Sequence, residues 1–245
     1  MISFLIKTNF FSQILDPNQP LRPGCVWDSN RTTLLSLLHQ ERIECYNLGI
    51  SRDEPNELYN KLTEGFLRSD VIITTGGVSM GEKDLLKQVL VEDFNATIHF
   101  GRINLKPGKP TTFSTCIFNR EKKFVFGLPG NPVSAFVTCQ LFVLPTLRLL
   151  AGGLKPNEEN LLAFHKVIQV KLKLEKESRK LDPRPEFVRA IVSYGDDVPS
   201  AFITGNQQSS RLLSVKDANA LVLLNQSSET IKEIKNNEIV KAILL

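Results

Sequence analysis

The stretch Val71-Ile72-Ile73-Thr74-Thr75-Gly76-Gly77-Val78-Ser79-Met80-Gly81-Glu82-Lys83-Asp84 decides the fold of this chain. Its first five residues are rich in β-branched side chains, which predicts a buried strand. Two glycines follow, and their backbone can adopt a positive φ or approach a ligand closely. A helical pattern of apolar residues begins at Glu82. The order strand, glycine loop, helix predicts an α/β fold with an anion site at the loop, because free N–H groups point there.

The same order also occurs in α/β proteins as a plain reversal of the chain. The loop matches neither G-x-x-x-x-G-K-[ST] nor G-x-G-x-x-G, so it indicates neither of those nucleotide-binding families. From the pattern alone, phosphate binding and simple chain reversal therefore both stay open. Asp84 adds a carboxylate, which suits Mg²⁺ beside a phosphate.

The composition is that of a soluble globular chain, with 42% hydrophobic and 23% charged residues among 245. The net charge of +4 is mild, which does not favour nucleic acid as a partner but suits an anionic substrate. The cysteines are isolated, as is typical of a reducing compartment. The start of the chain is too short and polar to span a bilayer and lacks a basic n-region. We therefore expect a cytosolic (cytoplasmic) protein without a membrane span.

Strands and helices are expected to alternate in the first part of the chain. Strands are predicted at 2–6, 45–50, 71–75, 97–103 and 124–128. The last helix runs from Pro132 to Leu150, with Asn131 as its cap and a kink at Pro145. This alternation predicts a parallel sheet with helices on both faces, a three-layer domain over residues 1–153.

The second part of the chain changes character after a polar linker at 154–164. Short stretches of alternating apolar and polar residues predict strands at 167–174, 187–192, 201–204, 220–224 and 239–245. Turn residues separate them. We therefore predict an all-β domain over residues 165–245, either a small sandwich or a barrel.

Three loops rich in glycine or proline follow strands, at 74–84, 104–112 and 127–134. Ligands bind outside the carboxyl ends of parallel strands, so we expect these loops to converge on one crevice. In Lys106-Pro107-Gly108-Lys109-Pro110 the two ammonium groups form either a clamp for an oxyanion such as phosphate or molybdate, or a basic surface turn. In Leu128-Pro129-Gly130-Asn131-Pro132-Val133-Ser134 the amides and a hydroxyl donate to an anion, or Asn131 is only a cap.

Charged residues near these loops have two readings. Asp28, Asp53 and Asp84 are candidates for Mg²⁺, and Asp28 and Asp53 are alternatively helix caps. In the β domain, the arginines are candidates for bidentate anion contacts or are partners of neighbouring carboxylates. The residues concerned are Arg184, Arg189 and Arg211, with Asp182 and Glu186 as the carboxylates. The three histidines are scattered without metal-ligand spacing.

Five runs of residues stand in an order that resembles one family. They are Asp28–Arg31, Thr75–Gly81 with Asp84, Lys106–Pro110, Leu128–Ser134 and Thr204–Arg211. Together they resemble the molybdenum-insertion family, which comprises the gephyrin E domain and the molybdopterin molybdenumtransferases. The resemblance covers residues 20–245. It implies a molybdopterin-binding domain like that of MoaB and Mog, followed by a small all-β domain.

The resemblance implies a transferase of molybdenum cofactor biosynthesis that binds a nucleotide. Molybdate and adenylated molybdopterin would be its substrates, and the adenylate would be hydrolysed with Mg²⁺. Asp53 and Asp84 would hold the metal and, with Lys109, would be catalytic. Contacts to cofactor or molybdate are implied for Gly76, Gly77, Ser79, Gly81, Lys106, Lys109, Pro110, Gly130, Asn131 and Ser134. Arg189 and Ser210 would lie near a second oxyanion position.

The sequence departs from the family at its start. Family members carry an N-terminal region before this point and a Thr-Gly-x-Glu loop where this sequence reads Lys7–Ile14. In the family that region, from a dimer partner, completes the site. We therefore expect a homodimer, and we expect this chain alone, as a fragment or degenerate paralogue, to be a poor catalyst. Two alternatives stay open: a non-catalytic gephyrin-like scaffold with receptor-loop or cytoskeletal partners, and a molybdopterin adenylyltransferase, which lacks such a β domain.

Overall fold

The computed structural model describes residues 2–7, 13–77, 84–152, 165–195 and 197–245, with side chains from residue 14 on. Contacts divide the chain into two compact units. The α/β unit comprises Met1–Ile103 and Gly108–Cys139, and the barrel unit comprises Asn104–Pro107 and Gln140–Leu245. The predicted linker at 154–164 lies outside the described residues.

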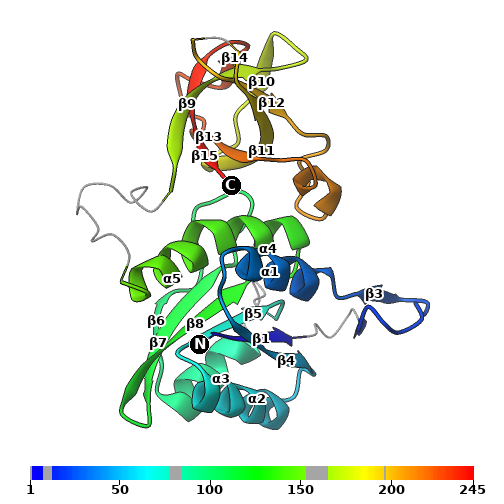
Figure 1. The fold of residues 1–245 in the computed structure, drawn as a ribbon, viewed down its shortest axis with the longest axis vertical. Coiled ribbons are helices and arrows are strands. Elements are labelled where there is room, and N and C mark those ends of the chain that lie inside the picture. The colour runs from blue at the N-terminus through cyan, green and yellow to red at the C-terminus, as the bar shows by residue number, and fades with distance from the viewer. Residues whose placement is uncertain (1, 8–12, 78–83, 153–164, 196) are drawn as a thin grey trace. The chain divides into compact units, whose positions relative to one another are not determined.

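A six-stranded sheet forms the centre of the α/β unit, in the order β4-β1-β5-β8-β7-β6 (Figure 1). The strands are β1 (Ile2–Lys7), β4 (Cys45–Ser51), β5 (Val71–Thr75), β6 (Thr97–Phe100), β7 (Thr112–Phe118) and β8 (Glu121–Leu128). The first four strands in that order are parallel to one another. The predicted α/β class is thereby confirmed, whereas β7 and β6 extend the sheet antiparallel.

Strand β7 has no counterpart among the predicted strands. It joins β8 through Asn119 and Arg120, which have φ values of 52° and 68°. Two successive residues at positive φ match the twist of a tight hairpin. The pair Asn-Arg lacks the glycine that normally announces such a turn, so the sequence pattern did not reveal the hairpin.

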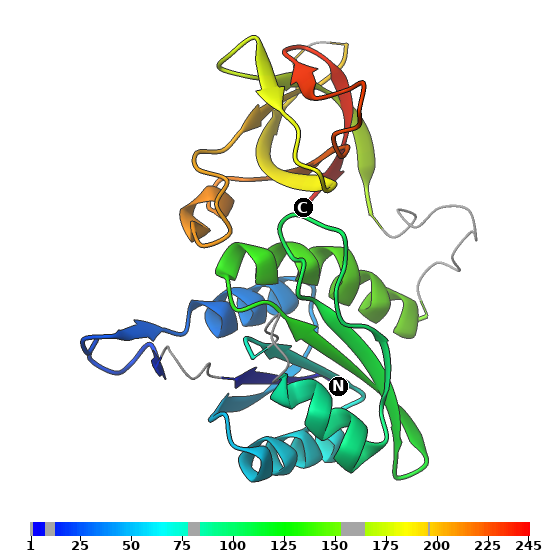
Figure 2. The same cartoon turned by 180° about the vertical axis from the view of Figure 1, so that it is seen from behind.

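Helices cover both faces of the sheet, as predicted. Helices α2 (Pro55–Arg68) and α3 (Leu85–Phe94) pack on one face, and α1 (Ser29–Gln40) and α4 (Pro132–Thr138) pack on the other (Figures 1 and 2). Helix α3 begins later than the predicted Glu82, because the Asp84 side chain accepts a hydrogen bond from the Lys87 N–H and so caps the helix. A further pair of short parallel strands, β2 (Gln13–Leu15) and β3 (Cys25–Trp27), precedes α1 and was not among the predicted strands.

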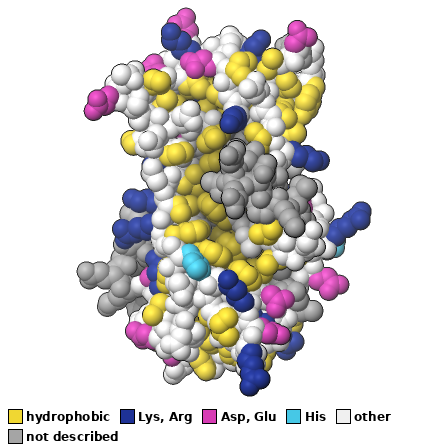
Figure 3. Space-filling model, turned by 90° about the vertical axis from the view of Figure 1, so that its left-hand side faces the viewer, with side chains coloured by type: hydrophobic (Ala, Val, Ile, Leu, Met, Phe, Trp, Pro, Cys, Tyr) yellow, Lys and Arg dark blue, Asp and Glu magenta, His cyan; other side chains and the backbone are white. Residues whose placement is uncertain are grey.

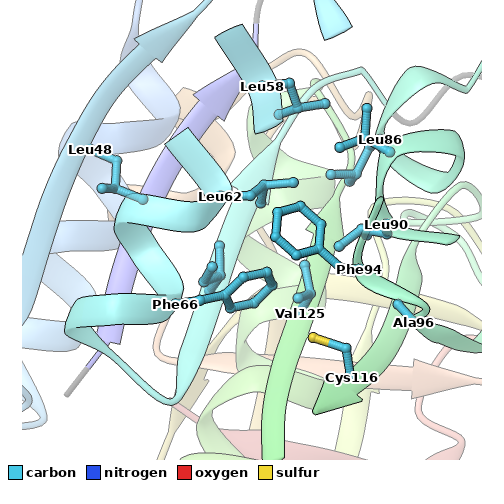
Figure 4. Close-up of a cluster of buried hydrophobic side chains, with 12 residues drawn as sticks. Leu48, Leu58, Leu62, Phe66, Leu86, Leu90, Phe94, Ala96, Cys116 and Val125 are labelled. Carbon is cyan, nitrogen blue, oxygen red and sulfur yellow. The ribbon is translucent and has the colours of Figure 1, made fainter. Parts of the chain in front are cut away.

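The face covered by α2 and α3 holds the main apolar cluster (Figure 4). Helix α2 contributes Leu58, Leu62 and Phe66 at the predicted spacing of four residues. The sheet contributes Ile72, which is fully buried. A Cβ at Gly65 of α2 would lie 2.8 Å from the Ile72 Cδ1, so helix and strand are in close contact.

Replacing Ile72 with valine should remove the methyl group that packs against Gly65. We expect the free energy of unfolding to fall by about 1 kcal/mol, the usual cost of this change in a core. Urea denaturation measures it. Ile117→Val is the matched control, because Ile117 is 66% exposed on β7. Equal losses in both variants would contradict the assigned packing.

The helix predicted from Pro132 to Leu150 is interrupted. It consists of α4, a π-helical turn at Cys139–Val143 and α5 (Leu144–Leu150). Pro145 cannot donate to the carbonyl four residues earlier, and the wider turn lies directly before it. By length and composition the whole helix passes as a membrane span, but 61% of its most apolar window is buried within the protein. That burial is what a core helix shows.

The barrel unit settles the choice between sandwich and barrel. Its strands close in the order β11-β12-β9-β15-β13. They are β9 (Val167–Lys173), β11 (Glu186–Ser193), β12 (Ser200–Ile203), β13 (Ala220–Leu224) and β15 (Ile239–Leu244). Alternate residues of these strands fill the interior, as the apolar–polar alternation predicts. A short ribbon of β10 (Ser178–Lys180) and β14 (Glu233–Lys235) was not predicted.

Candidate functional site

Two of the predicted loops meet where β5 and β8 end. The Gly76 N–H donates to the Leu128 carbonyl at 3.1 Å. A Cβ at Gly130 would lie 3.5 Å from the Gly76 Cα. Gly76 and Gly77 have φ values of 77° and 67°, a conformation that favours glycine. The two glycines therefore let the loop turn sharply beside the 128–131 turn.

Lys109 and Pro110 approach the same edge of the sheet, for a reason the sequence did not reveal. Because β7 is antiparallel to β8, it begins where β8 ends, and Thr112 pairs with Gly127. The preceding turn is fixed by the Thr111 hydroxyl, which donates to the Gly108 carbonyl at 2.6 Å. The expected convergence of this loop thus follows from an antiparallel strand rather than a parallel one.

Helix α1 begins at this edge with two buried polar residues. The Asp28 carboxylate accepts from the Arg31 N–H at 3.0 Å and lies 3.2 Å from the Arg31 Nε. Burial raises the pKa of this carboxyl, against the pull of Arg31. Asp28 is therefore a helix cap. Asn30, which our sequence reasoning did not single out, donates from Nδ2 to the Gly130 carbonyl at 2.8 Å.

The two aspartates predicted to bind metal lie in different segments. Asp84 caps α3, and its Oδ2 lies 3.0 Å from the Lys87 Nζ. Asp53 follows β4, two strands away from β5 in the sheet, and is partly buried. Over the described part of the chain, no group of three or more His, Cys, Asp or Glu side chains is placed to hold a metal ion.

Other predicted site residues of the α/β unit lie at the start of α4 or outside the described residues. Ser134 is buried in the first turn of α4. Asn131 occupies the cap position, but its side chain makes no capping bond, so the predicted side-chain cap is wrong. Pro132, which follows it, has no N–H and supplies a fixed φ at the helix start. Ser79 and Gly81 lie outside the described residues. Among the described residues, the buried hydroxyls of Thr74 and Thr75 have no hydrogen-bond partner, and no local sequence pattern predicts this.

Lys106 belongs to the barrel unit. Its backbone bonds to Pro185 and Phe187 on either side of Glu186. Its Nζ lies 3.0 Å from the Asp182 Oδ2 and 3.2 Å from the Glu186 Oε1. The ammonium predicted to contact an oxyanion thus already has two carboxylate neighbours.

Arg189 is the most enclosed charged residue of the barrel unit. It is 0% exposed, and its Nε donates to the Ser214 Oγ at 3.1 Å. Within the described ranges, neither terminal guanidinium nitrogen has a hydrogen-bond partner. Burial lowers the pKa of Arg189 to about 10, while the charge of Glu186 opposes that shift. A buried cation with free donors is suited to an anion.

Two runs of the β domain, a first at Asp182–Arg189 and a second at Thr204–Leu212, come together around Arg189. Its N–H donates to the Gln207 Oε1 at 2.9 Å, and the Thr204 N–H donates to its carbonyl at 3.0 Å. Ser210 lies in the exposed part of this second run.

Two other arginines of the β domain pair with neighbouring carboxylates, which was the alternative to an anion contact. Arg184 pairs with Asp182 at 3.0 Å and holds the pKa of that carboxyl down, to about 2. Arg179, which the sequence did not single out, donates to both Glu186 oxygens at 3.1 Å.

Over the face seen in Figure 3, side chains of both signs are spread out, in keeping with the mild net charge.

Comparisons with known proteins agree with this arrangement. Residues 13–149 match a family model described as "Probable molybdopterin binding domain", and residues 171–245 match "MoeA C-terminal region (domain IV)". The molybdenum cofactor synthesis protein cinnamon of Drosophila melanogaster is 42% identical over 96% of this chain and 37% of its own length. Gephyrin of Dictyostelium discoideum is 39% identical over 100% of this chain and 36% of its own.

Bacterial and archaeal relatives extend the likeness. A molybdopterin molybdenumtransferase of Nostoc is 31% identical over 86% of this chain and 47% of its own length. The chain thus spans less than half the length of these curated relatives. A crystal structure of a MoeA protein from Pyrococcus horikoshii matches 99% of this chain and 54% of its own, with a TM-score of 0.74 and 24% identity. That last likeness bears on the fold alone.

Proposed function

Since this chain belongs to the family of molybdopterin-binding domains followed by a MoeA C-terminal region, we propose that it inserts molybdenum from molybdate into adenylated molybdopterin. The observation that carries the proposal is the meeting of the Gly76–Gly77 loop with the 128–131 turn at the carboxyl edge of the sheet. Such an edge is where α/β sheets bind their ligands. Hydrolysis of the adenylate by water would release AMP as molybdenum passes to the dithiolene sulfurs.

In the α/β unit, backbone amides would bind the phosphates of the substrate. The amides of Gly77 and the 130–131 turn, with the Ser134 hydroxyl, would donate to phosphate oxygens. Gly76, whose N–H already bonds to the Leu128 carbonyl, would let a phosphate approach the backbone closely. Lys109, in the turn closed by Pro110, would supply a positive charge to the same group. Ser79 and Gly81 continue the glycine loop and have the same proposed role.

Mg²⁺ is part of the proposal, and the partly buried carboxylates of Asp53 and Asp84 are the groups that would take it. Mg²⁺ in phosphate sites commonly takes one or two protein carboxylates and completes its shell with phosphates and water. A cluster of three protein ligands is therefore not required, and Asp53 and Asp84 would hold the ion. It would neutralise phosphate charge when bound, while Lys87 orients the Asp84 carboxylate.

In the barrel unit, we propose that Lys106, Arg189 and Ser210 serve an oxyanion such as molybdate. The free terminal nitrogens of Arg189 support this role. We propose a homodimer as the working form. A gephyrin-like scaffold is the second candidate, favoured by the likeness to Dictyostelium gephyrin along the whole chain.

Hydrolysis of adenylated molybdopterin with Mg²⁺ and molybdate tests the proposed activity. Asp84→Asn should lower the rate about tenfold, because a metal ligand and its orientation are weakened. Asp93→Asn is the matched control, since Asp93 is exposed on the same helix. If neither the wild-type chain nor the same chain with a grafted family N-terminal region turns over the adenylate, the transferase proposal is wrong and the scaffold is favoured. If Asp84→Asn matches the wild type, Asp84 has no part in it.

A further inference from the structure

Asn30 is a buried amide that links two distant segments of the α/β unit. It is the second residue of α1 and is 9% exposed. Its Nδ2 donates to the carbonyl of Gly130, 100 residues later in the chain. Asp28 caps the same helix and pairs with Arg31, so the backbone that carries Asn30 is fixed. Asn30 therefore holds the 128–131 turn, which in turn lies against Gly76.

The other end of this amide has no partner. The Asn30 Oδ1 is buried and accepts no hydrogen bond from any described residue. Reversing the amide would place Oδ1 against the Gly130 carbonyl, where two acceptors would face each other, so the donor assignment is set by the contact. A buried acceptor without a donor is costly and uncommon in folded proteins. A ligand that brings a donor would remove that cost.

The chemistry of this position selects the kind of ligand group. An amide oxygen only accepts hydrogen bonds, and the oxygens of an ionised phosphate or of molybdate also only accept. Asp28, two residues earlier and 3% exposed, adds a carboxylate that repels an anion. The group that fits is thus an uncharged N–H donor. In adenylated molybdopterin such donors lie on the pterin ring and its amino group and on the adenine amino group, whereas in free molybdopterin only the pterin has them.

We propose that Asn30 recognises the pterin of the substrate through Oδ1 while it positions the 128–131 turn through Nδ2. This inference rests on the proposed function. It adds a substrate contact at Asn30, a residue that has no role in the proposed function. It places the pterin on the α1 side of the 128–131 turn and the phosphates on the Gly76–Gly77 side of the same turn.

Binding of molybdopterin, followed by its intrinsic fluorescence, tests the inference without any turnover. Asn30→Leu keeps the size of the side chain and removes both polar atoms. We expect the dissociation constant to rise about tenfold, the effect of losing one buried hydrogen bond. The melting temperature should stay within a few degrees, because Gly130 is an exposed residue and water can replace Nδ2. Asn60→Leu, on an exposed position of α2, is the control.

Asn30→Asp supplies a second readout that a purely structural role would not give. Its protonated form donates to Gly130 and still presents an acceptor, whereas its ionised form repels the Gly130 carbonyl. Burial and Asp28 should raise its pKa, so binding should recover from about pH 8 to about pH 5.5. The wild type should show no such recovery.

The outcomes are distinguishable. Equal affinity of wild type and Asn30→Leu would overturn the inference and leave the proposed function standing. A collapse of the melting temperature in Asn30→Leu, with no recovery of Asn30→Asp at low pH, would assign Asn30 a structural role only and would also overturn it. Failure of the wild type to bind molybdopterin would overturn the proposed function and the inference together.

Discussion

Replacing Arg189 with methionine is expected to weaken molybdate binding by the barrel unit about 100-fold. The two free terminal nitrogens of Arg189 offer charge-assisted hydrogen bonds, each of which is worth roughly 1.5–3 kcal/mol. Loss of about 2.7 kcal/mol corresponds to a factor of 100. Isothermal calorimetry with molybdate alone measures this change without the pterin.

The same substitution is expected to leave the protein at least as stable. Arg189 is 0% exposed, and burial has lowered its pKa to about 10, which shows that the surroundings disfavour its charge. Keeping a charge out of water is costly, so exchanging it for an apolar side chain of similar volume should be neutral or stabilising. Binding and stability should therefore move in opposite directions, as at sites kept for function.

Arg184→Met provides the matched control for this experiment. Arg184 lies on the same run, but it is 34% exposed in its side chain and is paired with Asp182. We expect a smaller change in molybdate affinity, less than about threefold, because that charge is already compensated. If both variants bind molybdate as the wild type does, the barrel has no oxyanion site at Arg189. If Arg189→Met unfolds the protein, the guanidinium is structural.

Removing both cations around Glu186 is expected to destabilise the barrel unit by about 3–5 kcal/mol. The Glu186 side chain is 3% exposed and contacts Lys106 and Arg179, which are 35% and 25% exposed. Because the cations are partly solvated, either one alone is replaceable, and Lys106→Met or Arg179→Met should each cost about 1 kcal/mol. The double substitution leaves the buried Glu186 carboxylate without either of these ion-pair partners.

A third substitution makes this prediction specific. Adding Glu186→Gln to the double variant removes the buried charge and should restore most of the lost stability. Urea denaturation of the single, double and triple variants measures the coupling. Lys180→Met is the control, since Lys180 is exposed on the ribbon that carries Arg179. Additive losses, or no recovery in the triple variant, would mean that Glu186 does not link the two cations.

Lys106 would contact an oxyanion differently from Arg189. Its ammonium is held by Asp182 and Glu186 and so has a fixed position. An arriving anion would share that ammonium with the carboxylates, whereas Arg189 offers donors that nothing else uses. We therefore expect Lys106→Met to reduce molybdate affinity less than Arg189→Met does.

The sequence by itself determined the features that depend on neighbouring residues. The β-branched run before Gly76, the four-residue spacing of Leu58, Leu62 and Phe66, and the alternation in Val167–Lys173 each report one element through its own period. The order of the elements then fixed the α/β class and the change to a β domain. These are local properties. The spacing of apolar residues along one helix or strand depends only on which face of that element is buried.

Only the tertiary structure decided which distant residues meet. The antiparallel β7 brings Lys109 to the site, and Asn30 reaches Gly130 across the unit. Lys106 is paired with carboxylates of the barrel unit, whereas Arg189 keeps two free nitrogens. Each outcome depends on burial and on partners brought from far along the chain, and no local period encodes them. Two arginines five residues apart, Arg184 and Arg189, look alike in the sequence and differ because solvent reaches one and the fold encloses the other.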